Sequence, residues 1–270
     1  MRFALRLKRA CFLSHSRNTL RPFLLSVHVR FLFRAAYLLA TVCWGLIAVL
    51  VLYPLIGEPR RRAVKKSWAR QMLKACGLSI TIQAAPDGSL EPQAGELVVM
   101  NHISFIDILA LDALRPVHFI AKSEIRDWPV VGILCARTGT IFIERGKRHA
   151  VHDVLKIMAD ELRAGEVVSF FPEGTTSDGR QLLPFHANLF EAAVRAQAAV
   201  RPVRISYLQN GAYTSLAAFI DDLTLVDCAL TVFRAQGLSV HLQMLDRIES
   251  DGLNRHALAA KVRAAMEDCA

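Results

Sequence analysis

The sequence predicts an α/β fold with a mostly parallel central sheet flanked by helices, preceded by N-terminal membrane helices. From Leu78 onward, short apolar runs alternate with helix-like stretches, which is the pattern of βαβ units covered on both faces. Before them, residues 35–57 contain no charged residue over 23 positions, which is long enough to cross a hydrocarbon core about 30 Å thick. We therefore divide the chain into membrane-associating residues 1–76 and an α/β domain at residues 77–270.

The N-terminal segment is strongly basic. Residues 1–75 hold 15 of the 33 Lys and Arg residues and one of the 24 acidic residues, so the net charge of +9 belongs to this segment. Each Lys or Arg near an anionic lipid surface contributes about 1 kcal/mol to binding, so membrane lipids are an expected partner. The bases alternate with Leu, Phe and Val and no nucleic-acid-binding motif accompanies them, so nucleic acid is not an expected partner.

The apolar segment 35–57 is predicted to be a membrane helix. It is too long for a removed signal peptide and has no small-residue cleavage pattern. Bases flank it on both sides, so charge leaves open whether it spans the membrane or dips into one leaflet. Residues 58–75 scatter apolar side chains among seven bases, and we interpret them as a helix lying in the membrane interface, with a solvated helix packed on the domain as the alternative.

The remaining elements are expected in a regular order. Strands are predicted at residues 78–83, 97–100, 117–121, 139–143, 167–171, 201–207 and 238–244. Helices are predicted at residues 105–114, 129–137, 149–164, 187–199 and 253–267. The six cysteines are scattered without a Cys-x-x-Cys spacing, which argues against a disulfide scaffold or a zinc knuckle and favours a reducing compartment.

The first chemical motif is Asn101-His102-Ile103-Ser104-Phe105-Ile106-Asp107, which follows a predicted strand and opens a predicted helix. Open α/β sheets place their sites at this end of a strand. A turn there brings Asp107 back to His102, where a carboxylate fixes the imidazole tautomer and leaves the other ring nitrogen to take a proton. The alternative is that Asp107 only caps the helix.

Two further motifs also end apolar strands. Residues 139–146 end in Glu144-Arg145-Gly146, and the Arg145 guanidinium suits capture of a phosphate or carboxylate. The alternative is a solvated charged turn. Residues 170–177 place Glu173 between Pro172 and Gly174, so the backbone is bent and can approach a ligand closely. Here the alternative is a turn with Glu173 on the surface, and a fourth, weaker motif is the proline-containing strand start at residues 200–203.

In this order and spacing, after an apolar helix, the motifs resemble the glycerophospholipid acyltransferase family of the lysophosphatidic acid acyltransferase type. The resemblance covers roughly residues 80–210. It rests on the histidine and aspartate at 102 and 107 (an HX4D motif), on the Gly-x-Ile-Phe-Ile-x-Arg strand at 139–145, on Phe-Pro-Glu-Gly-Thr at 171–175, and on Val-x-Pro-Val at 200–203.

The resemblance implies a role for each matched position. His102 would be the general base that removes a proton from the acceptor hydroxyl, and Asp107 would orient it. Arg145 would hold an acidic head group. The remaining substrate-binding positions are Glu173, Gly174 and Thr175, which would shape the acceptor pocket, and Lys122, which would help to stabilise the oxyanion. No metal ligand and no cofactor-binding residue is expected.

The implied reaction moves a fatty acyl group from acyl-ACP or acyl-CoA, as co-substrate, to a lysophospholipid hydroxyl. The first expectation for the acceptor is 1-acyl-sn-glycerol-3-phosphate, giving phosphatidic acid, on the cytoplasmic face of a bacterial inner membrane. One departure matters: Thr176 stands where many such enzymes have arginine. It opens the alternative of another lysolipid, such as a lyso-ornithine lipid, with Arg180 as a replacement charge. A non-catalytic lipid-binding protein is the remaining alternative.

Other chemistries are disfavoured. Ser104 lies close to His102, but the sequence has no Gly-x-Ser-x-Gly elbow. His149, His152 and Asp153 have metal-compatible spacing, but they begin a predicted amphipathic helix. The sequence also lacks a Walker loop and a Gly-x-Gly-x-x-Gly motif. We therefore do not expect nucleotide-driven hydrolysis or hydride transfer as the function.

Overall fold

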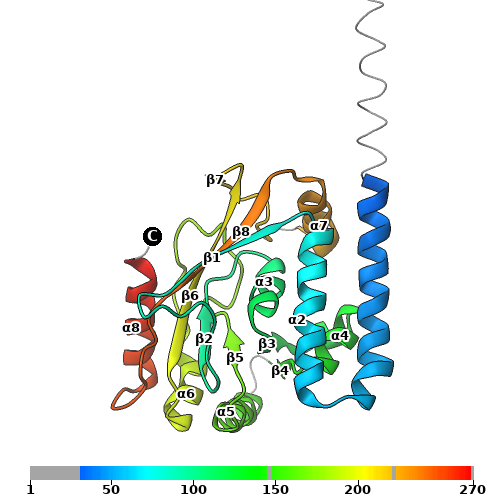
Figure 1. Cartoon of the computed structure of the whole chain (residues 1–270). Coiled ribbons are helices and arrows are strands. Elements are labelled where there is room, and N and C mark those ends of the chain that lie inside the picture. Colours follow the sequence, from blue (N-terminus) through cyan, green and yellow to red (C-terminus); the bar gives the residue numbers. More distant parts are fainter. Residues whose placement is uncertain (1–30, 145–147, 221–222, 269–270) are drawn as a thin grey trace, which may run out of the picture.

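The computed structural model describes residues 31–144, 148–220 and 223–268, with Arg148 described by its backbone alone. Its centre is one eight-stranded sheet in the order β1-β8-β6-β2-β5-β3-β4, with β7 paired to β6 (Figure 1). The strands are β1 Ser79–Gln83, β2 Leu97–Met100, β3 His118–Lys122, β4 Ile141–Ile143, β5 Val168–Phe170, β6 Val200–Gln209, β7 Ala212–Tyr213 and β8 Leu238–Met244.

The sheet is parallel on both sides of one antiparallel junction. Strands β6, β2, β5, β3 and β4 are mutually parallel, β1 is parallel to β8, and β8 runs antiparallel to β6. The prediction of a mostly parallel sheet flanked by helices is therefore confirmed. In the parallel part, loops that follow neighbouring strands meet at one edge of the sheet. We call this the catalytic edge, and the opposite edge, where β2 and β6 begin, the far edge.

Helices cover both faces of the sheet (Figure 1). They are α2 Glu58–Ala75, α3 Ile106–Leu114, α4 Val131–Arg137, α5 Arg148–Arg163, α6 Glu191–Ala196, α7 Leu225–Arg234 and α8 Arg255–Glu267, with short 3₁₀ helices η3 Ser123–Asp127 and η4 Ala187–Phe190. Alternate residues of β2 point to opposite faces, so Val98 and Met100 pack with the α2–α3 side. Leu97 and Val99 pack with α5, α6 and α8. These two apolar layers explain why β2 is buried along its whole length.

The apolar N-terminal segment is a helix over Phe31–Leu55 that is long and apolar enough to cross a membrane. The helix ends in a π-helical turn, η1 Ala48–Leu52, which is followed by a 3₁₀ turn, η2 Tyr53–Leu55. The helix lies along the domain rather than projecting from it (Figure 1). Phe31 contacts Phe233 of α7 with ring centroids 5.0 Å apart, and Trp68 Nε1 of α2 donates to the Thr41 carbonyl at 2.9 Å.

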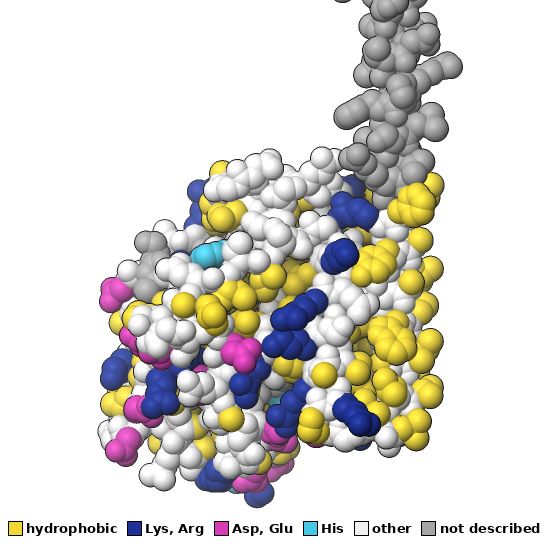
Figure 2. Space-filling view, viewed as in Figure 1, with side chains coloured by type: hydrophobic (Ala, Val, Ile, Leu, Met, Phe, Trp, Pro, Cys, Tyr) yellow, Lys and Arg dark blue, Asp and Glu magenta, His cyan; other side chains and the backbone are white. Residues whose placement is uncertain are grey.

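One face of this helix remains apolar and exposed, and Lys and Arg side chains of α2 run beside it (Figure 2). The exposed apolar residues are Leu32, Phe33, Leu39, Ile47, Leu50, Val51 and Leu55. An apolar face bordered by basic side chains is the composition of a helix that inserts into the surface of a bilayer.

The α2 helix packs as a helix of the domain, which is the alternative that the sequence left open. It buries Ala69, Leu73 and Ala75 in the apolar layer that also contains α3. Arg70 Nε donates to the Ala113 carbonyl at 2.9 Å. Its apolar side chains are therefore used in packing on protein. Most of its Lys and Arg side chains lie at its outer surface, whereas Lys65 points inward and pairs with Asp112 of α3.

The predicted strands and helices agree with the structure to within a few residues. The short elements η3 and β7 were not predicted, and the longest element that the sequence analysis did not predict is α7. A capping box between Thr224 and Asp227 starts this helix, and α7 buries Cys228, Val232 and Phe233. The division of the chain at residue 76 stays a prediction.

Candidate active site

The chemical motifs come together at the catalytic edge. The first motif follows β2 and the third follows β5, which are paired strands. Lys122 ends β3, the next strand in the sheet, and β4 ends at Ile143 beside it. Because neighbouring strands lie about 4.8 Å apart, the end of β4 is about 14 Å from the end of β2.

His102 and Asp107 form a hydrogen-bonded pair. The distance from His102 Nδ1 to Asp107 Oδ2 is 2.9 Å. The turn between them is closed because Asp107 Oδ2 also accepts the backbone N–H groups of Ile103 and Ser104, at 2.7 and 3.0 Å. An ionised carboxylate can only accept, so Nδ1 carries the ring proton and Nε2 carries the lone pair. Asp107 thus caps the turn and orients the imidazole at the same time.

A buried tyrosine completes the carboxylate's environment. Tyr207 on β6 donates its hydroxyl hydrogen to Asp107 Oδ1 at 2.6 Å, and both side chains are fully buried. Burial, followed by the nearby Asp107 charge, raises the pKa of Tyr207 well above 10. The phenol therefore stays protonated and remains a donor throughout the physiological pH range.

The His102 ring is held in place from a second side. It stacks on Phe171 with ring centroids 3.8 Å apart and an interplanar angle of 10°. Its side chain is 20% exposed, and within the described residues Nε2 makes no hydrogen bond. The basic nitrogen is therefore accessible while the ring itself cannot swing freely.

Glu173 is buried against the His102 backbone. Its side chain is 4% exposed. Its two oxygens accept the backbone N–H groups of His102, at 2.7 Å, and of Leu183, at 2.8 Å, and burial raises its pKa. The carboxylate therefore joins the third motif to the first and fixes the His102 backbone, and its part in shaping an acceptor pocket stays a prediction.

The loop after Glu173 folds back over the first motif. Gly174 has φ of +70°, the conformation that favours glycine, and it is half-buried, whereas Thr175 is exposed. Ser177 N–H donates to the His102 carbonyl at 2.8 Å. The Thr176 hydroxyl donates to the Phe219 carbonyl, so it is engaged with the protein.

Of the two expected cations of the site, only Lys122 belongs to the described residues, and it lies away from His102. Lys122 is exposed at the end of β3, two strands from β2 and so about 10 Å from it. Arg145 lies outside the described residues. Gly139, which begins the second motif, has φ of +86°, and a Cβ there would lie 2.3 Å from the His118 ring, so that position accepts only glycine.

Other residues considered from the sequence lie at the surface. Arg180 is 71% exposed, pairs with Asp178 and stacks over Tyr213 at 5.3 Å, while His186 is exposed in the loop before η4. His149, His152 and Asp153 lie on α5. Over the described ranges, no group of three or more His, Cys, Asp or Glu is placed to hold a metal ion.

Ser104 does not act on the histidine as a hydrolase nucleophile would. Its side chain is fully buried, and its N–H is committed to Asp107. Buried in the protein, its hydroxyl cannot meet a substrate, which agrees with the absence of a nucleophile elbow.

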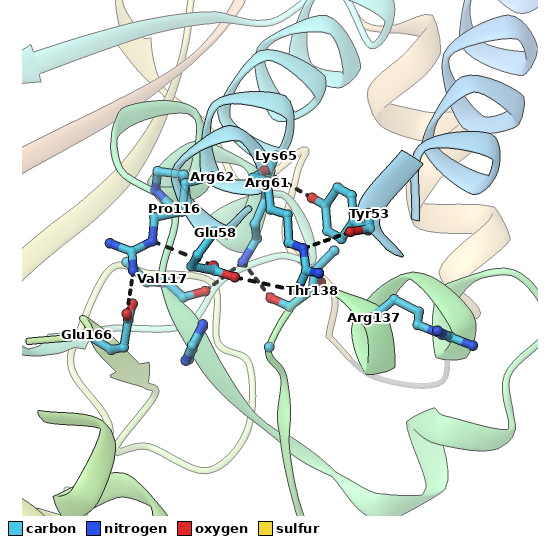
Figure 3. Close-up of a pocket in the computed structure, with 12 residues that line it drawn as sticks. Tyr53, Glu58, Arg61, Arg62, Lys65, Pro116, Val117, Arg137, Thr138 and Glu166 are labelled. Atoms are coloured by element: carbon cyan, nitrogen blue, oxygen red, sulfur yellow. Dashed lines mark hydrogen bonds and ion pairs between the residues drawn. The ribbon is translucent and has the colours of Figure 1, made fainter. Parts of the chain in front are cut away.

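The fourth motif lies at the far edge, where β6 begins. Arg201 is fully buried, and its guanidinium pairs with Glu96 and Asp87, each at 2.9 Å. A cavity of about 190 Å³ also opens at the far edge, between the start of α2 and the start of β3 (Figure 3). Lys65 there pairs with Asp112 at 3.1 Å, and Arg62 pairs with Glu166. These groups serve the packing of α2 on the domain.

The fold, the apolar helix and the His102–Asp107 pair suit a class of enzyme that uses an oriented imidazole close to a lipid surface. Comparison with known proteins gives the class a name. Residues 82–206 match the sequence profile of the family described as Acyltransferase. A lyso-ornithine lipid O-acyltransferase of Pseudomonas aeruginosa is 35% identical over 88% of this chain and 92% of its own length.

Two further matches agree. A 1-acyl-sn-glycerol-3-phosphate acyltransferase of Neisseria meningitidis is 35% identical over 76% of this chain and 79% of its own length. The crystal structure of the 1-acyl-sn-glycerophosphate acyltransferase PlsC from Thermotoga maritima has the same fold, with a TM-score of 0.65, 19% identity and coverage of 90% of this chain and 97% of that one. The chain belongs to the acyltransferase family.

The sequence reading named His102 and Asp107 but missed Tyr207 and Phe171 as their supports. Tyr207 occupies the same face of β6 as Val203 and Ile205, all buried. A tyrosine at a buried position needs a partner for its hydroxyl, and this requirement is the signal that could have pointed to it. The partner itself depends on the pairing of β6 with β2, which the sequence did not specify.

Proposed function

We propose that the protein is a membrane-associated O-acyltransferase that moves a fatty acyl group from a thioester to the hydroxyl of a lysolipid, with a lyso-ornithine lipid as the acceptor. The observation that carries the reaction is the His102 imidazole, held by Asp107 at 2.9 Å with its second nitrogen accessible. The arrangement suits general-base removal of a hydroxyl proton.

In the proposed step, His102 Nε2 takes the acceptor's hydroxyl proton as the oxygen attacks the thioester carbonyl carbon. A tetrahedral oxyanion forms, and its collapse breaks the carbon–sulfur bond. The departing thiolate then receives the proton from Nε2, so histidine returns to its starting state and no acyl-enzyme forms. Asp107 stabilises the transient imidazolium, and loop N–H groups or Lys122 would stabilise the oxyanion.

The choice of acceptor rests on charge at the third motif. A phosphate monoester carries about −1.5 to −2 charges at pH 7, whereas an ornithine head group carries one carboxylate and one ammonium. Thr176 replaces a cation with a hydroxyl that is already bonded to Phe219. The less anionic head group fits a site with one cation fewer, and the similarity to the Pseudomonas aeruginosa enzyme supports this choice.

Lysophosphatidic acid is the second candidate. The Neisseria meningitidis relative supports it, and Lys122 lies on the same edge of the sheet as His102. The donor is a thioester of acyl carrier protein or coenzyme A. Because thiolate is a good leaving group, we propose that transfer needs neither a metal nor a bound cofactor, so that a chelator leaves the rate unchanged.

For the membrane, we propose that the Phe31–Leu55 helix lies in one leaflet of a bacterial inner membrane on its cytoplasmic face. The helix packs along the domain from Phe31, against α7, to Tyr53, whose hydroxyl bonds to Arg61 of α2. A helix that crossed the bilayer would carry the polar domain into lipid with it. Soluble acyl thioesters are made in the cytoplasm, and a protease-accessibility map that places His102 on the opposite side would refute this topology.

The test of the reaction is acyl transfer from radiolabelled acyl-ACP and acyl-CoA to a panel of lysolipids by the full chain in phospholipid vesicles. We expect product with lyso-ornithine lipid for the wild type, and a loss of at least about 10²-fold for His102→Ala. Equal transfer by both proteins would refute the mechanism. Binding of lysolipid without turnover by either protein would favour a lipid-binding protein.

A further inference from the structure

We infer that Tyr207 is a positioning residue for acyl transfer, which sets the basicity of His102 through Asp107. The inference rests on the proposed function and deepens it. Tyr207 does not touch His102, and it lies beneath the site on β6. Its hydroxyl hydrogen bond to Asp107 Oδ1, at 2.6 Å, is the shortest of the four that the carboxylate accepts from the described residues.

The four hydrogen bonds divide unequally between the two oxygens. Oδ2 accepts from His102, Ile103 and Ser104, while Oδ1 accepts from Tyr207 alone among the described residues. The carboxylate is fully buried, and no Lys or Arg of the described chain pairs with it. The tyrosine is therefore the one donor that draws charge toward the oxygen remote from the histidine.

This division of charge affects proton transfer. The more strongly Tyr207 holds Oδ1, the less negative charge remains at Oδ2 to stabilise a protonated imidazole. Loss of the phenol hydroxyl would make the imidazolium more favourable, so His102 would be protonated at higher pH. The titratable groups that surround the carboxylate are His102 on the same turn, Tyr207 on β6, Glu173 after β5 and Cys228 on α7.

A purely structural role predicts a different result. If Tyr207 only filled space and donated a hydrogen bond that the buried Asp107 carboxylate needs for folding, its loss would reduce the amount of folded enzyme. The shape of the pH–rate profile would not change. Tyr53 supplies a matched control. It is also a buried tyrosine, its hydroxyl donates to one oxygen, the Arg61 carbonyl at 3.2 Å, and it lies at the far edge.

The experiment compares the wild type, Tyr207→Phe and Tyr53→Phe as full chains in phospholipid vesicles. Initial rates of acyl transfer are measured against pH and against both substrates. For Tyr207→Phe we expect the acid limb of the profile to move up by about one pH unit and kcat on that limb to fall about tenfold, with KM unchanged for both substrates. Tyr53→Phe should keep the wild-type profile.

A second replacement should move the acid limb of the pH–rate profile in the opposite direction. It also keeps the test independent of whether Tyr207→Phe folds well. Tyr207→3-fluorotyrosine keeps the shape of the side chain but makes the phenol a stronger donor, so the acid limb should move to lower pH. If neither replacement moves the acid limb relative to Tyr53→Phe, the inference is wrong even though acyl transfer stands. If the wild type transfers no acyl group to any lysolipid, the proposed function itself fails.

Discussion

At the far edge of the sheet, buried Glu96 pairs with Arg201 and buried Asp112 pairs with the partly buried Lys65. At the catalytic edge, Asp107 and Glu173 are buried without a Lys or Arg partner among the described residues. All four carboxylates are at most 4% exposed. The two edges thus bury the same kind of charge and stabilise it differently. The far edge uses cations, and the catalytic edge uses N–H and O–H groups.

The difference follows from what each edge must do. An ion pair satisfies a buried carboxylate but leaves it with little capacity to respond when a neighbour gains a proton. The N–H and O–H groups that surround Asp107 carry no net positive charge, so they leave its negative charge unneutralised, and that charge can stabilise an imidazolium on His102. The far edge has no proton to move, so its carboxylates are free to form ion pairs that join α2 and β6 to the rest of the domain.

The largest effect should follow from removing the charge at the catalytic edge. In Asp107→Asn, an amide oxygen can still accept at the position of Oδ2, and Tyr207 can turn its hydroxyl to accept from the amide. We therefore expect the fold to survive while kcat falls by about 10³-fold, because the imidazolium loses its counter-charge. Activity per folded molecule, with circular dichroism as the folding control, measures this. A fall of less than tenfold would mean that charge at this edge is not needed.

The opposite pattern is expected at the far edge. Arg201→Leu leaves the 3% exposed Glu96 carboxylate without a cation, which should cost about 3 to 5 kcal/mol of the free energy of unfolding. Activity per folded molecule should be unchanged. Chemical denaturation of the detergent-solubilised chain measures the loss, and Arg201→Leu combined with Glu96→Leu should regain most of it. A single variant as stable as the wild type would contradict the comparison.

The second far-edge pair gives a prediction with a pH dependence. Burial raises the pKa of Asp112, and Lys65 opposes that shift, so Lys65→Met raises the pKa further. When the pKa of a carboxyl is higher in the folded protein than in the unfolded chain, the protein loses stability as pH rises through the folded-state pKa. The variant should therefore be less stable than the wild type by about 3 kcal/mol at neutral pH, with the difference shrinking in acid as Asp112 becomes protonated. Thermal unfolding at several pH values tests the direction of this pH dependence, with Lys156→Met, at an exposed position, as the control. A deficit that does not change with pH would argue against it.

The sequence predicts which motifs lie at the catalytic edge. Which side chains contact one another there depends on the order of the strands in the sheet. His102 and Glu173 each follow an apolar run that is predicted to be a strand. The local pattern alone therefore placed both residues at the same edge of the sheet. The sequence could not show that Glu173 faces back toward the His102 N–H, because that depends on the pairing of β2 with β5.

Strand order also decides which residues of β6 reach the site. The motif at residues 200–203 resembles a block of the family, and as the start of β6 it lies at the opposite edge from the loops that follow the parallel neighbours of β6. Tyr207, five residues after Pro202 on β6, does reach the site. Helix α7 was missed because its start depends on a side-chain capping box between Thr224 and Asp227 rather than on a long apolar periodicity.

The smallest expected effect comes from adding a cation where the catalytic edge lacks one. Thr176→Arg removes the hydroxyl that bonds to Phe219 and brings a guanidinium beside the first motif, where it can pair bidentately with a phosphate. We expect the ratio of kcat/KM for lysophosphatidic acid over lyso-ornithine lipid to rise about tenfold, with Thr176→Gln as the control for size. Because His102 and Asp107 are untouched, the change should appear in KM for the acceptor. A ratio that stays constant would mean that the head group is selected elsewhere, and Lys122 and Arg145 would become the next positions to vary.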